Sequence, residues 1–169
     1  MTAFAIAIAR AMGLPRDQIV IIARGAFLHD IGKTGIPDKI LRKPEKLDDE
    51  ETVIMRKHCR LGYEMVGKIP FLEQAREIIH SHHERYDGTG YPKGLIGQQI
   101  PLGARIVAIA NTLDSITSDL PYRHSQSFAV AREEIEGWSG LQFDPQVVKA
   151  FQQIPDGLFE ELKRDIDKA

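Results

Sequence analysis

Apolar residues recur with a helical period along almost the whole chain, and this pattern constrains the fold more than any other feature. Alternating apolar and polar residues, which are typical of half-buried strands, are absent, and so are the Asn-Gly pairs that favour hairpins. The chain is therefore expected to be all-α. The period predicts helices near residues 2–12, 17–30, 48–66, 71–83, 103–118, 125–137, 144–153 and 156–167.

Local signals support two of the helix starts. Asp48 with Glu51 three residues later forms a plausible capping box, and Asp144 before Pro145 is typical of an N-cap followed by proline at the first helical position. The first segment, "MTAFAIAIARAMGLP", opens inside an apolar-periodic helix without a polar lead-in. It indicates either a helix cut within its first turns or a genuine start that lacks a good cap.

Two long segments lack a helical pattern. They are "GKTGIPDKILRKPEKL", residues 32–47, and "ERYDGTGYPKGLIGQQIPLG", residues 84–103. Loops of this length in a small helical domain are usually functional, so both are expected to shape a site.

Composition limits the classes of partner and of compartment. A chain of 169 residues suits one domain, and its 22 Lys and Arg nearly balance 24 Asp and Glu, so no global field favours a nucleic acid polymer or a membrane surface. The single cysteine, Cys59, excludes an internal disulfide and fits a reducing compartment such as the cytoplasm. Neither a signal peptide nor an apolar run long enough to span a bilayer is visible.

Histidines cluster near the ends of predicted helices. "FLHD" carries His29 beside Asp30, "MRKHC" carries His58, and "IIHSHHE" carries a group that includes His82 and His83, while His124 stands apart. His58 follows Ile54 by four residues, and the paired histidines follow Ile79 by three and four. Such spacings place side chains on one helix face, so imidazoles from three helices are expected to point inward.

The group predicts a metal site more strongly than any member does. A single histidine on an apolar face is more often a hydrogen-bonded core residue than a ligand. Several inward imidazoles beside Asp30 each need a partner or lose solvation, and a divalent cation satisfies them together. Nitrogen ligands mixed with a carboxylate favour zinc, iron, manganese or nickel.

Asp30 and Lys33 are the candidate catalytic residues. A carboxylate has two oxygens, so Asp30 could bridge two cations that hold a water between them and lower its pKa for attack on phosphorus. Lys33, one turn later, could neutralise phosphate charge. The alternative for Lys33 is a solvated lysine at a helix C-terminus.

These residues carry a resemblance to a known family. "HD" at 29–30, "GK" at 32–33, His58 and "HHERYDGTGYP" at 82–92 resemble the HD-GYP family of bacterial phosphodiesterases, and the likeness continues through "IPLGARIVAIA", "LDSITSDLPYR" and "FDPQVV". The resemblance implies an all-α HD-superfamily helical bundle with an ordered GYP loop. It also implies one HD-GYP domain over residues 1–169, truncated at its N-terminal helix.

The same resemblance implies an activity and its cofactors. The expected reaction is hydrolysis of cyclic di-GMP to pGpG or GMP by two or three divalent metal ions, with iron or manganese the usual choice. The partners implied are a GGDEF-type domain and an upstream receiver or sensor domain. The implied metal ligands are His29, Asp30, His58, His82, His83 and, as a weak ligand, Asn111. The implied substrate contacts are Gly90, Tyr91, Pro92 and Arg123.

The sequence departs from the family at three places. A further histidine of the first helix, sometimes with a glutamate, falls before Met1. Asn111 stands where the family usually has an aspartate ligand, so it keeps a carbonyl oxygen but loses the charge, and Asp114 is not expected to replace it. Leu120 stands where the family usually has an arginine, so a phosphate contact is lost.

These departures keep alternatives to the enzyme open. One is a degenerate HD-GYP domain that binds metal or nucleotide weakly and acts through protein contacts, as the changes at Asn111 and Leu120 favour. Another is a different HD-superfamily phosphohydrolase that acts on nucleotides or (p)ppGpp, which the GYP loop disfavours. Asn111 could also be a hydrogen-bonded core amide.

Overall fold

The structure is a computed structural model that describes residues 1–119 and 124–167. No β-strand forms in these two stretches, which contain one isolated bridge between Ser139 and Phe143. The α-helices are α1 (Thr2–Ala11), α2 (Arg16–Leu28), α3 (Asp38–Leu41), α4 (Asp49–Arg56), α5 (His58–Val66), α6 (Glu73–Ser81), α7 (Leu102–Thr117), α8 (Phe128–Gly137), α9 (Pro145–Gln152) and α10 (Asp156–Asp167). The short 3-10 helices are η1 (Ile31–Gly35), η2 (Pro70–Leu72) and η3 (Gly97–Gln99).

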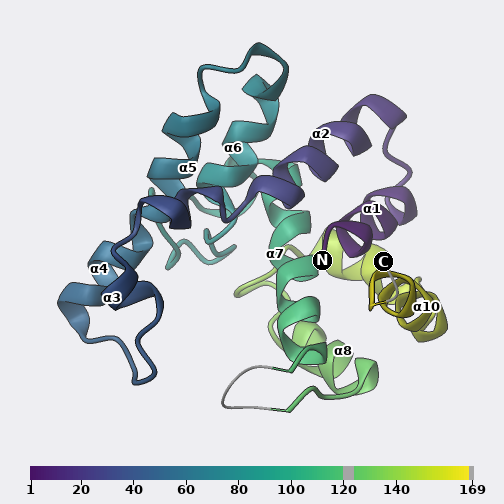
Figure 1. Cartoon of the computed structure of the whole chain (residues 1–169). Coiled ribbons are helices and arrows are strands. Elements are labelled where there is room, and N and C mark those ends of the chain that lie inside the picture. Colours follow the sequence, from purple (N-terminus) through teal and green to yellow (C-terminus); the bar gives the residue numbers. More distant parts are fainter. Residues whose placement is uncertain (120–123, 168–169) are drawn as a thin grey trace.

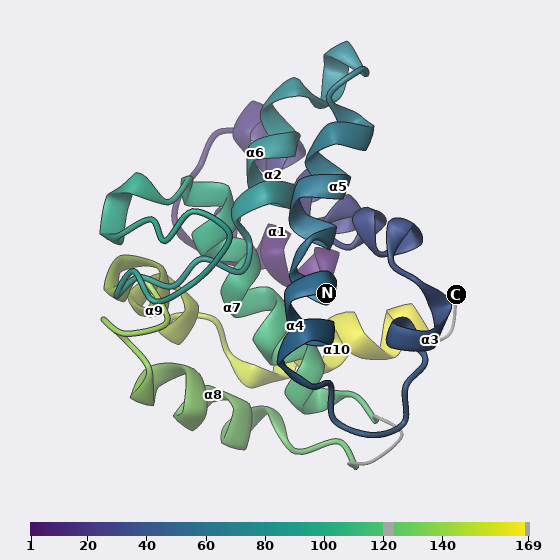
Figure 2. The same cartoon turned by 90° about the vertical axis from the view of Figure 1, so that its left-hand side faces the viewer.

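Helix α7 runs through the middle of the bundle (Figure 1). It packs against α1, α2 and α6 and also against α8 and α9, while α5 pairs with α6 and with η1. Helices α3 and α4 form a separate lobe beside this body (Figures 1 and 2). The expected all-α fold is confirmed for the described residues.

Two apolar clusters hold the bundle together. The larger one surrounds α7, where Ile106, Ile109 and Leu113 are fully buried. The smaller one, centred on Leu72 and Ile79, packs against Leu28 and Ile31 at the turn between α2 and η1. The second cluster therefore fixes the position of the C-terminal end of α2 relative to that of α6. Predicted ligands directly follow each of these two helix ends. No helix of the described residues has the length and apolarity that crossing a membrane requires.

Three predicted helix boundaries are wrong for one physical reason. The segments 17–30 and 71–83 end early, at Leu28 and Ser81, and 48–66 is broken at Lys57 into α4 and α5. A histidine stands at each point, and its ring Nδ1 lies 2.7–2.8 Å from the backbone carbonyl oxygen three residues earlier. That carbonyl oxygen accepts a hydrogen bond from the histidine side chain at the point where the regular backbone hydrogen bonds of the helix end.

The remaining expectations hold with small shifts. The Asp48–Glu51 capping box forms, and Asp144 caps α9 by accepting from the Gln146 backbone N–H at 2.7 Å. Helix α8 starts at Phe128 rather than near residue 125, after the Ser127 side chain caps it. The two segments expected to lack helix contain short ones, η1 and α3 in the first and η3 in the second.

A close backbone approach attaches η1 to α5. A Cβ on Gly32 would lie 1.9 Å from the His58 carbonyl oxygen and 2.5 Å from the Gly62 nitrogen. Only a residue without a side chain allows this spacing. It carries Asp30, two residues before Gly32, to the end of α5 where His58 lies.

We expect Gly32→Ala to lower the free energy of unfolding by about 1–3 kcal/mol, as overpacking usually does. The added methyl would meet backbone rather than a side chain that can turn away. Urea unfolding measures the effect. Gly157→Ala is the matched control, since its methyl would meet nothing within 4 Å in α10, and a gain of about 0.5–1 kcal/mol is expected. Equal stability of Gly32→Ala and the wild type would contradict the close approach.

Candidate metal centre

Imidazoles from three helix ends converge on one point. His58 Nε2 lies 3.4 Å from His82 Nε2, and the His29 and His82 ring centroids are 5.2 Å apart. The ring of His83 lies 4.2 Å from that of His82 and 5.1 Å from that of His58. The structure therefore brings together the four histidines that the sequence singled out as ligands.

Backbone carbonyls fix which ring nitrogen faces the centre. His29, His58 and His82 place Nδ1 2.8, 2.7 and 2.8 Å from the carbonyl oxygens of Ala26, Met55 and Ile79. A carbonyl oxygen can only accept, so Nδ1 carries the proton in each ring. The neutral rings then present Nε2 as a bare lone pair, which is the form that binds a metal ion.

Two of these lone pairs face each other in a buried space. Only 1% of His58 and 3% of His82 is exposed, and neither Nε2 can donate to the other at their 3.4 Å separation. A hydrogen-bonded core pair would need a proton between the rings, whereas a cation satisfies both nitrogens at once. Two metal–nitrogen bonds of about 2.1 Å at a tetrahedral angle put their nitrogens about 3.4 Å apart. The arrangement thus fits a divalent cation.

Burial keeps these rings neutral. It lowers the pKa of His58, lowers that of His82 well below its usual value, and lowers that of His83 to about 4. The neighbouring imidazoles lower the last two further. At neutral pH the three rings are therefore already in the form that binds a metal ion.

The Asp30 carboxylate lies between two histidines and a lysine. Its Oδ1 is 3.6 Å from His58 Nε2, and its Oδ2 is 3.3 Å from His29 Nε2 and 2.7 Å from Lys33 Nζ. Burial raises the pKa of Asp30, but the nearby imidazole of His29 and the hydrogen bond and charge of Lys33 outweigh it, and the net pKa is lowered. The carboxylate is therefore ionised and directs each oxygen toward a different imidazole.

The sequence prediction missed Cys59 as a member of this cluster. One ligand atom from each of His58, Cys59, His82 and His83 lies within 4.8 Å of the others, and Cys59 Sγ is 3.5 Å from His58 Nε2. Burial raises the pKa of the Cys59 thiol to about 12 in the absence of a cation. The signal available in the sequence was that Cys59 directly follows His58. From the sequence, Cys59 served only to exclude a disulfide and to infer a reducing compartment.

The GYP loop lies directly against the histidines. The Tyr91 ring stacks on His83 with centroids 4.8 Å apart, and the guanidinium of Arg56 lies 4.8 Å above the Tyr91 ring. Burial raises the pKa of the Tyr91 hydroxyl above its usual value. The tyrosine therefore braces His83 as well as bordering the pocket.

A second residue that sequence reasoning missed, Glu84, holds the loop in place. Only 3% of Glu84 is exposed, and its carboxylate accepts from the Lys93 and Leu95 backbone N–H groups at 2.7 and 3.1 Å. A Cβ on Gly90 would lie 2.3 Å from the Arg85 backbone nitrogen, so the loop returns directly over its own start. Glu84 follows the paired histidines in sequence, which was the signal available.

A cavity of about 230 Å³ opens beside this loop. Its lining includes His82, His83, Tyr91, Arg56 and Asn111. Asn111 thus lies on the same cavity as two predicted ligands, as expected for a residue that points inward from α7.

Of the remaining positions singled out in the sequence, Asp114 does not add to this cavity. The Asp114 carboxylate pairs with the Met1 amine at 2.9 Å and does not line it. Leu120 and Arg123 lie outside the described residues.

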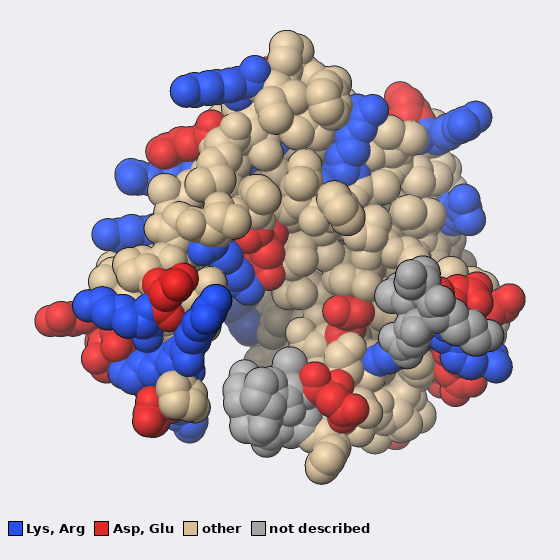
Figure 3. All heavy atoms as spheres, in the orientation of Figure 1, with Lys and Arg blue, Asp and Glu red and all other residues tan. Residues whose placement is uncertain are grey.

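Positive charge borders the GYP loop. A hollow of about 480 Å³ adjoins Tyr91 and Pro92 and is lined by Arg56, Lys57 and Arg60. On the face in Figure 3, the Lys and Arg side chains over the lobe of α3 and α4 are mixed with Asp and Glu, beside a hollow in the surface. The three cations beside the GYP loop favour an anionic ligand near the cluster.

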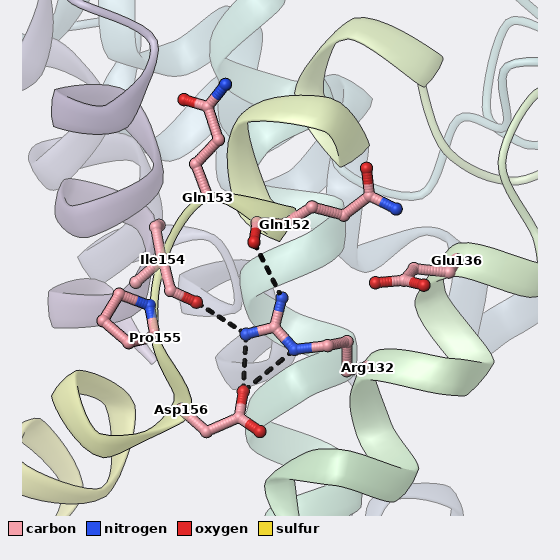
Figure 4. A pocket seen from close by; sticks show the side chains of 7 residues that line it. All are labelled: Arg132, Glu136, Gln152, Gln153, Ile154, Pro155 and Asp156. Atoms are coloured by element: carbon pink, nitrogen blue, oxygen red, sulfur yellow. Dashed lines mark hydrogen bonds and ion pairs between the residues drawn. The ribbon is translucent and has the colours of Figure 1, made fainter.

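A separate hollow of about 500 Å³ surrounds Arg132 (Figure 4). The guanidinium donates to the Ile154 carbonyl at 2.6 Å and to Asp156 Oδ1 at 2.9 Å, and lies 4.9 Å above the Phe151 ring. The side chain that could bind an anion is therefore engaged in joining α8 to the turn before α10. This hollow is structural.

A model of the HD domain family matches residues 1–147. The chain belongs to the HD domain family. Individual relatives support the narrower resemblance to HD-GYP proteins. The chain is 40% identical over 95% of its length to a cyclic di-GMP phosphodiesterase of Thermotoga maritima, and 42% identical over 85% to the cyclic di-GMP phosphodiesterase response regulator RpfG of Xanthomonas campestris pv. campestris. The resemblance to HD-GYP proteins is confirmed.

Other relatives differ in the substrate that they are named for. A 3′3′-cGAMP-specific phosphodiesterase of Vibrio cholerae is 39% identical over 84% of this chain. A crystal structure of a cyclic GMP-AMP phosphodiesterase from the same organism superposes with a TM-score of 0.69 over 90% of the chain at 21% identity, which supports the fold. The chain spans 44% and 38% of the lengths of the Thermotoga and Xanthomonas relatives.

We expect His82→Gln to lose bound metal and His80→Gln to keep it. His80 is the matched control because it lies two residues earlier, in the last turn of α6, with its ring against Tyr63 and outside the cluster. Losing the hydrogen-bond partner of a ligand costs about 10- to 100-fold in metal affinity, and losing the ligand costs at least as much. Elemental analysis of the purified variants measures the difference. Full metal content in His82→Gln would show that the ligand assignment is wrong.

We expect Glu84→Gln to loosen the GYP loop. The glutamine NH2 would face one of the two backbone N–H groups, and losing a bond to a charged acceptor costs about 1.5–3 kcal/mol. Exchange of the Lys93 and Leu95 amide hydrogens should become about 10-fold faster or more. The Gly97 amide, which donates to the Tyr86 carbonyl at 2.9 Å, is the internal control. Unchanged hydrogen exchange at all three amides would show that Glu84 does not hold the GYP loop in place.

Proposed function

We propose that this HD domain is a metal-dependent phosphodiesterase that hydrolyses cyclic di-GMP to pGpG or GMP in bacterial second-messenger signalling. The observation that carries the proposal is the pair of buried imidazole lone pairs, 3.4 Å apart, whose protons are held away by backbone carbonyls. The two nitrogens cannot hydrogen-bond to each other, and one cation would satisfy both.

The proposed ligands are His29, Asp30, His58, His82 and His83, with Asn111 as a weak neutral donor. Two or three divalent ions are proposed, with iron or manganese as first candidates. The two Asp30 oxygens face different histidines, at 3.3 and 3.6 Å, which supports a bridging role. Bound cations would supply Lewis-acid stabilisation and a water of lowered pKa for in-line attack.

The chain's own residues have distinct tasks in this proposal. Lys33 holds one Asp30 oxygen at 2.7 Å and offers a positive charge to a phosphate oxygen. Tyr91 keeps His83 oriented by stacking, and Gly90 and Pro92 set the course of the loop beside the cavity. Arg123 is proposed as a further phosphate contact. Exclusion of water by the buried rings strengthens each of these interactions.

The substrate assignment rests on three supports. The GYP loop borders the cavity, cations gather beside that loop, and several relatives are named cyclic di-GMP phosphodiesterases. Since others are named for 3′3′-cGAMP, both dinucleotides belong in the assay.

Asn111 favours a second candidate, a degenerate domain that binds metal or nucleotide weakly and acts through protein contacts. An amide at this position of the cavity supplies an oxygen without negative charge, so the site holds cations less firmly than one with a second carboxylate.

The wider setting follows from the resemblance. Residues 1–169 are proposed to act as one catalytic domain in the cytoplasm. A GGDEF-type domain or an upstream receiver or sensor domain is its proposed partner.

The test is a hydrolysis assay on cyclic di-GMP and 3′3′-cGAMP with metal analysis of the same samples. We expect turnover that a chelator abolishes and added metal restores. Asp30→Asn should lose at least about 100-fold, because Lewis-acid stabilisation is worth several kcal/mol. Asn111→Asp should hold metal more tightly, and His80→Gln should match the wild type.

Two results would decide against the enzyme. A wild-type protein that is inert and metal-free, beside an active Asn111→Asp, would establish the degenerate domain. Turnover that persists undiminished in Asp30→Asn would refute the metal-dependent reaction.

A further inference from the structure

Cys59 is a buried residue that lies beside the candidate ligands. Its side chain is fully buried, yet it belongs to neither of the two hydrophobic clusters among the described residues. Its sulfur instead lies 3.5 Å from His58 Nε2 and within 4.8 Å of ligand atoms of His82 and His83. A small apolar filler would need none of these neighbours.

The separation of sulfur and nitrogen fits a shared cation. Metal–sulfur and metal–nitrogen bonds of about 2.3 and 2.1 Å at a tetrahedral angle place the two donor atoms about 3.6 Å apart. The observed distances are 3.5 Å from Cys59 Sγ to His58 Nε2 and 3.4 Å between the His58 and His82 nitrogens. Both values match atoms that coordinate one ion.

The charge of the proposed ligands favours coordination by the sulfur. The resemblance leads us to expect a carboxylate at the position of Asn111, and the amide there carries no charge. With Asn111 neutral, Asp30 is the one carboxylate among the proposed ligands. A thiolate would restore a second negative charge to the centre and would balance more of the charge of a divalent cation.

We propose that Cys59 is a sulfur ligand of the metal centre and biases it toward zinc or iron over manganese. The inference rests on the proposed metal site. On binding, the S–H bond breaks, the proton leaves to solvent, and a sulfur–metal bond forms without any change of oxidation state. Thiolate ligands select softer cations, and manganese prefers oxygen ligands.

Cobalt(II) provides a direct test because thiolate-to-cobalt charge transfer absorbs in the near ultraviolet. Cys59 is the only cysteine in the chain, so such a band has a single possible source. The purified chain is stripped by a chelator and titrated with Co²⁺. We expect the band to grow to saturation in the wild type and to be missing from Cys59→Ser and Cys59→Ala.

Affinity and selectivity supply a second readout. Cys59→Ser should bind zinc about 10-fold less tightly or worse, because losing a ligand lowers metal affinity at least as much as losing the hydrogen-bond partner of a ligand. The affinity for manganese should change less. Met65→Leu, which removes a sulfur that accepts from Thr34 at 3.7 Å, is the matched control and should keep the band. Circular dichroism establishes that each variant is folded.

The outcomes separate the two proposals. Cobalt binding by the wild type without the band, or with a band that survives in Cys59→Ser, overturns the sulfur ligand and leaves the metal centre standing. Failure of the folded wild type to bind cobalt or zinc overturns both.

Discussion

The fixed orientation of three imidazoles is the constraint on which the candidate site depends. A backbone carbonyl at 2.7–2.8 Å holds the Nδ1 proton of His29, His58 and His82, so each Nε2 is left as a lone pair aimed at its neighbours. Each bond also lies where a helix ends or breaks. The same interaction thus sets the local fold and prepares the ligand, and neither can change without the other.

Close packing brings these helix ends together. Gly32 lets η1 lie on the backbone of α5 with no room for a methyl group, which carries Asp30 to within 3.6 Å of His58. On the other side of the cluster, buried Glu84 ties the GYP loop back to the segment that bears His82 and His83. The site is therefore positioned by close backbone packing on one side and by hydrogen bonds from a buried carboxylate on the other.

Much of the fold was predictable because helical periodicity is a local property. The periods gave α1, α7, α9 and α10 to within one residue at each end. They failed at His29, His58 and His82, since a periodic pattern carries no information on which carbonyl a side chain will bond. For the same reason Cys59 and Glu84 were missed as site residues. Their roles depend on contacts with groups that the chain order alone does not place.

The sequence by itself determined the helical class, the family and the residue types that could bind a metal, because these follow from period, motif and ligand chemistry. The tertiary structure decided which of them meet. It placed the four histidines and Asp30 around one point, added Cys59 to that cluster, set Asn111 on the same cavity, and gave Arg132 a structural role. Distances between side chains on separate helices depend on how the helices pack, and packing is a property of the whole chain.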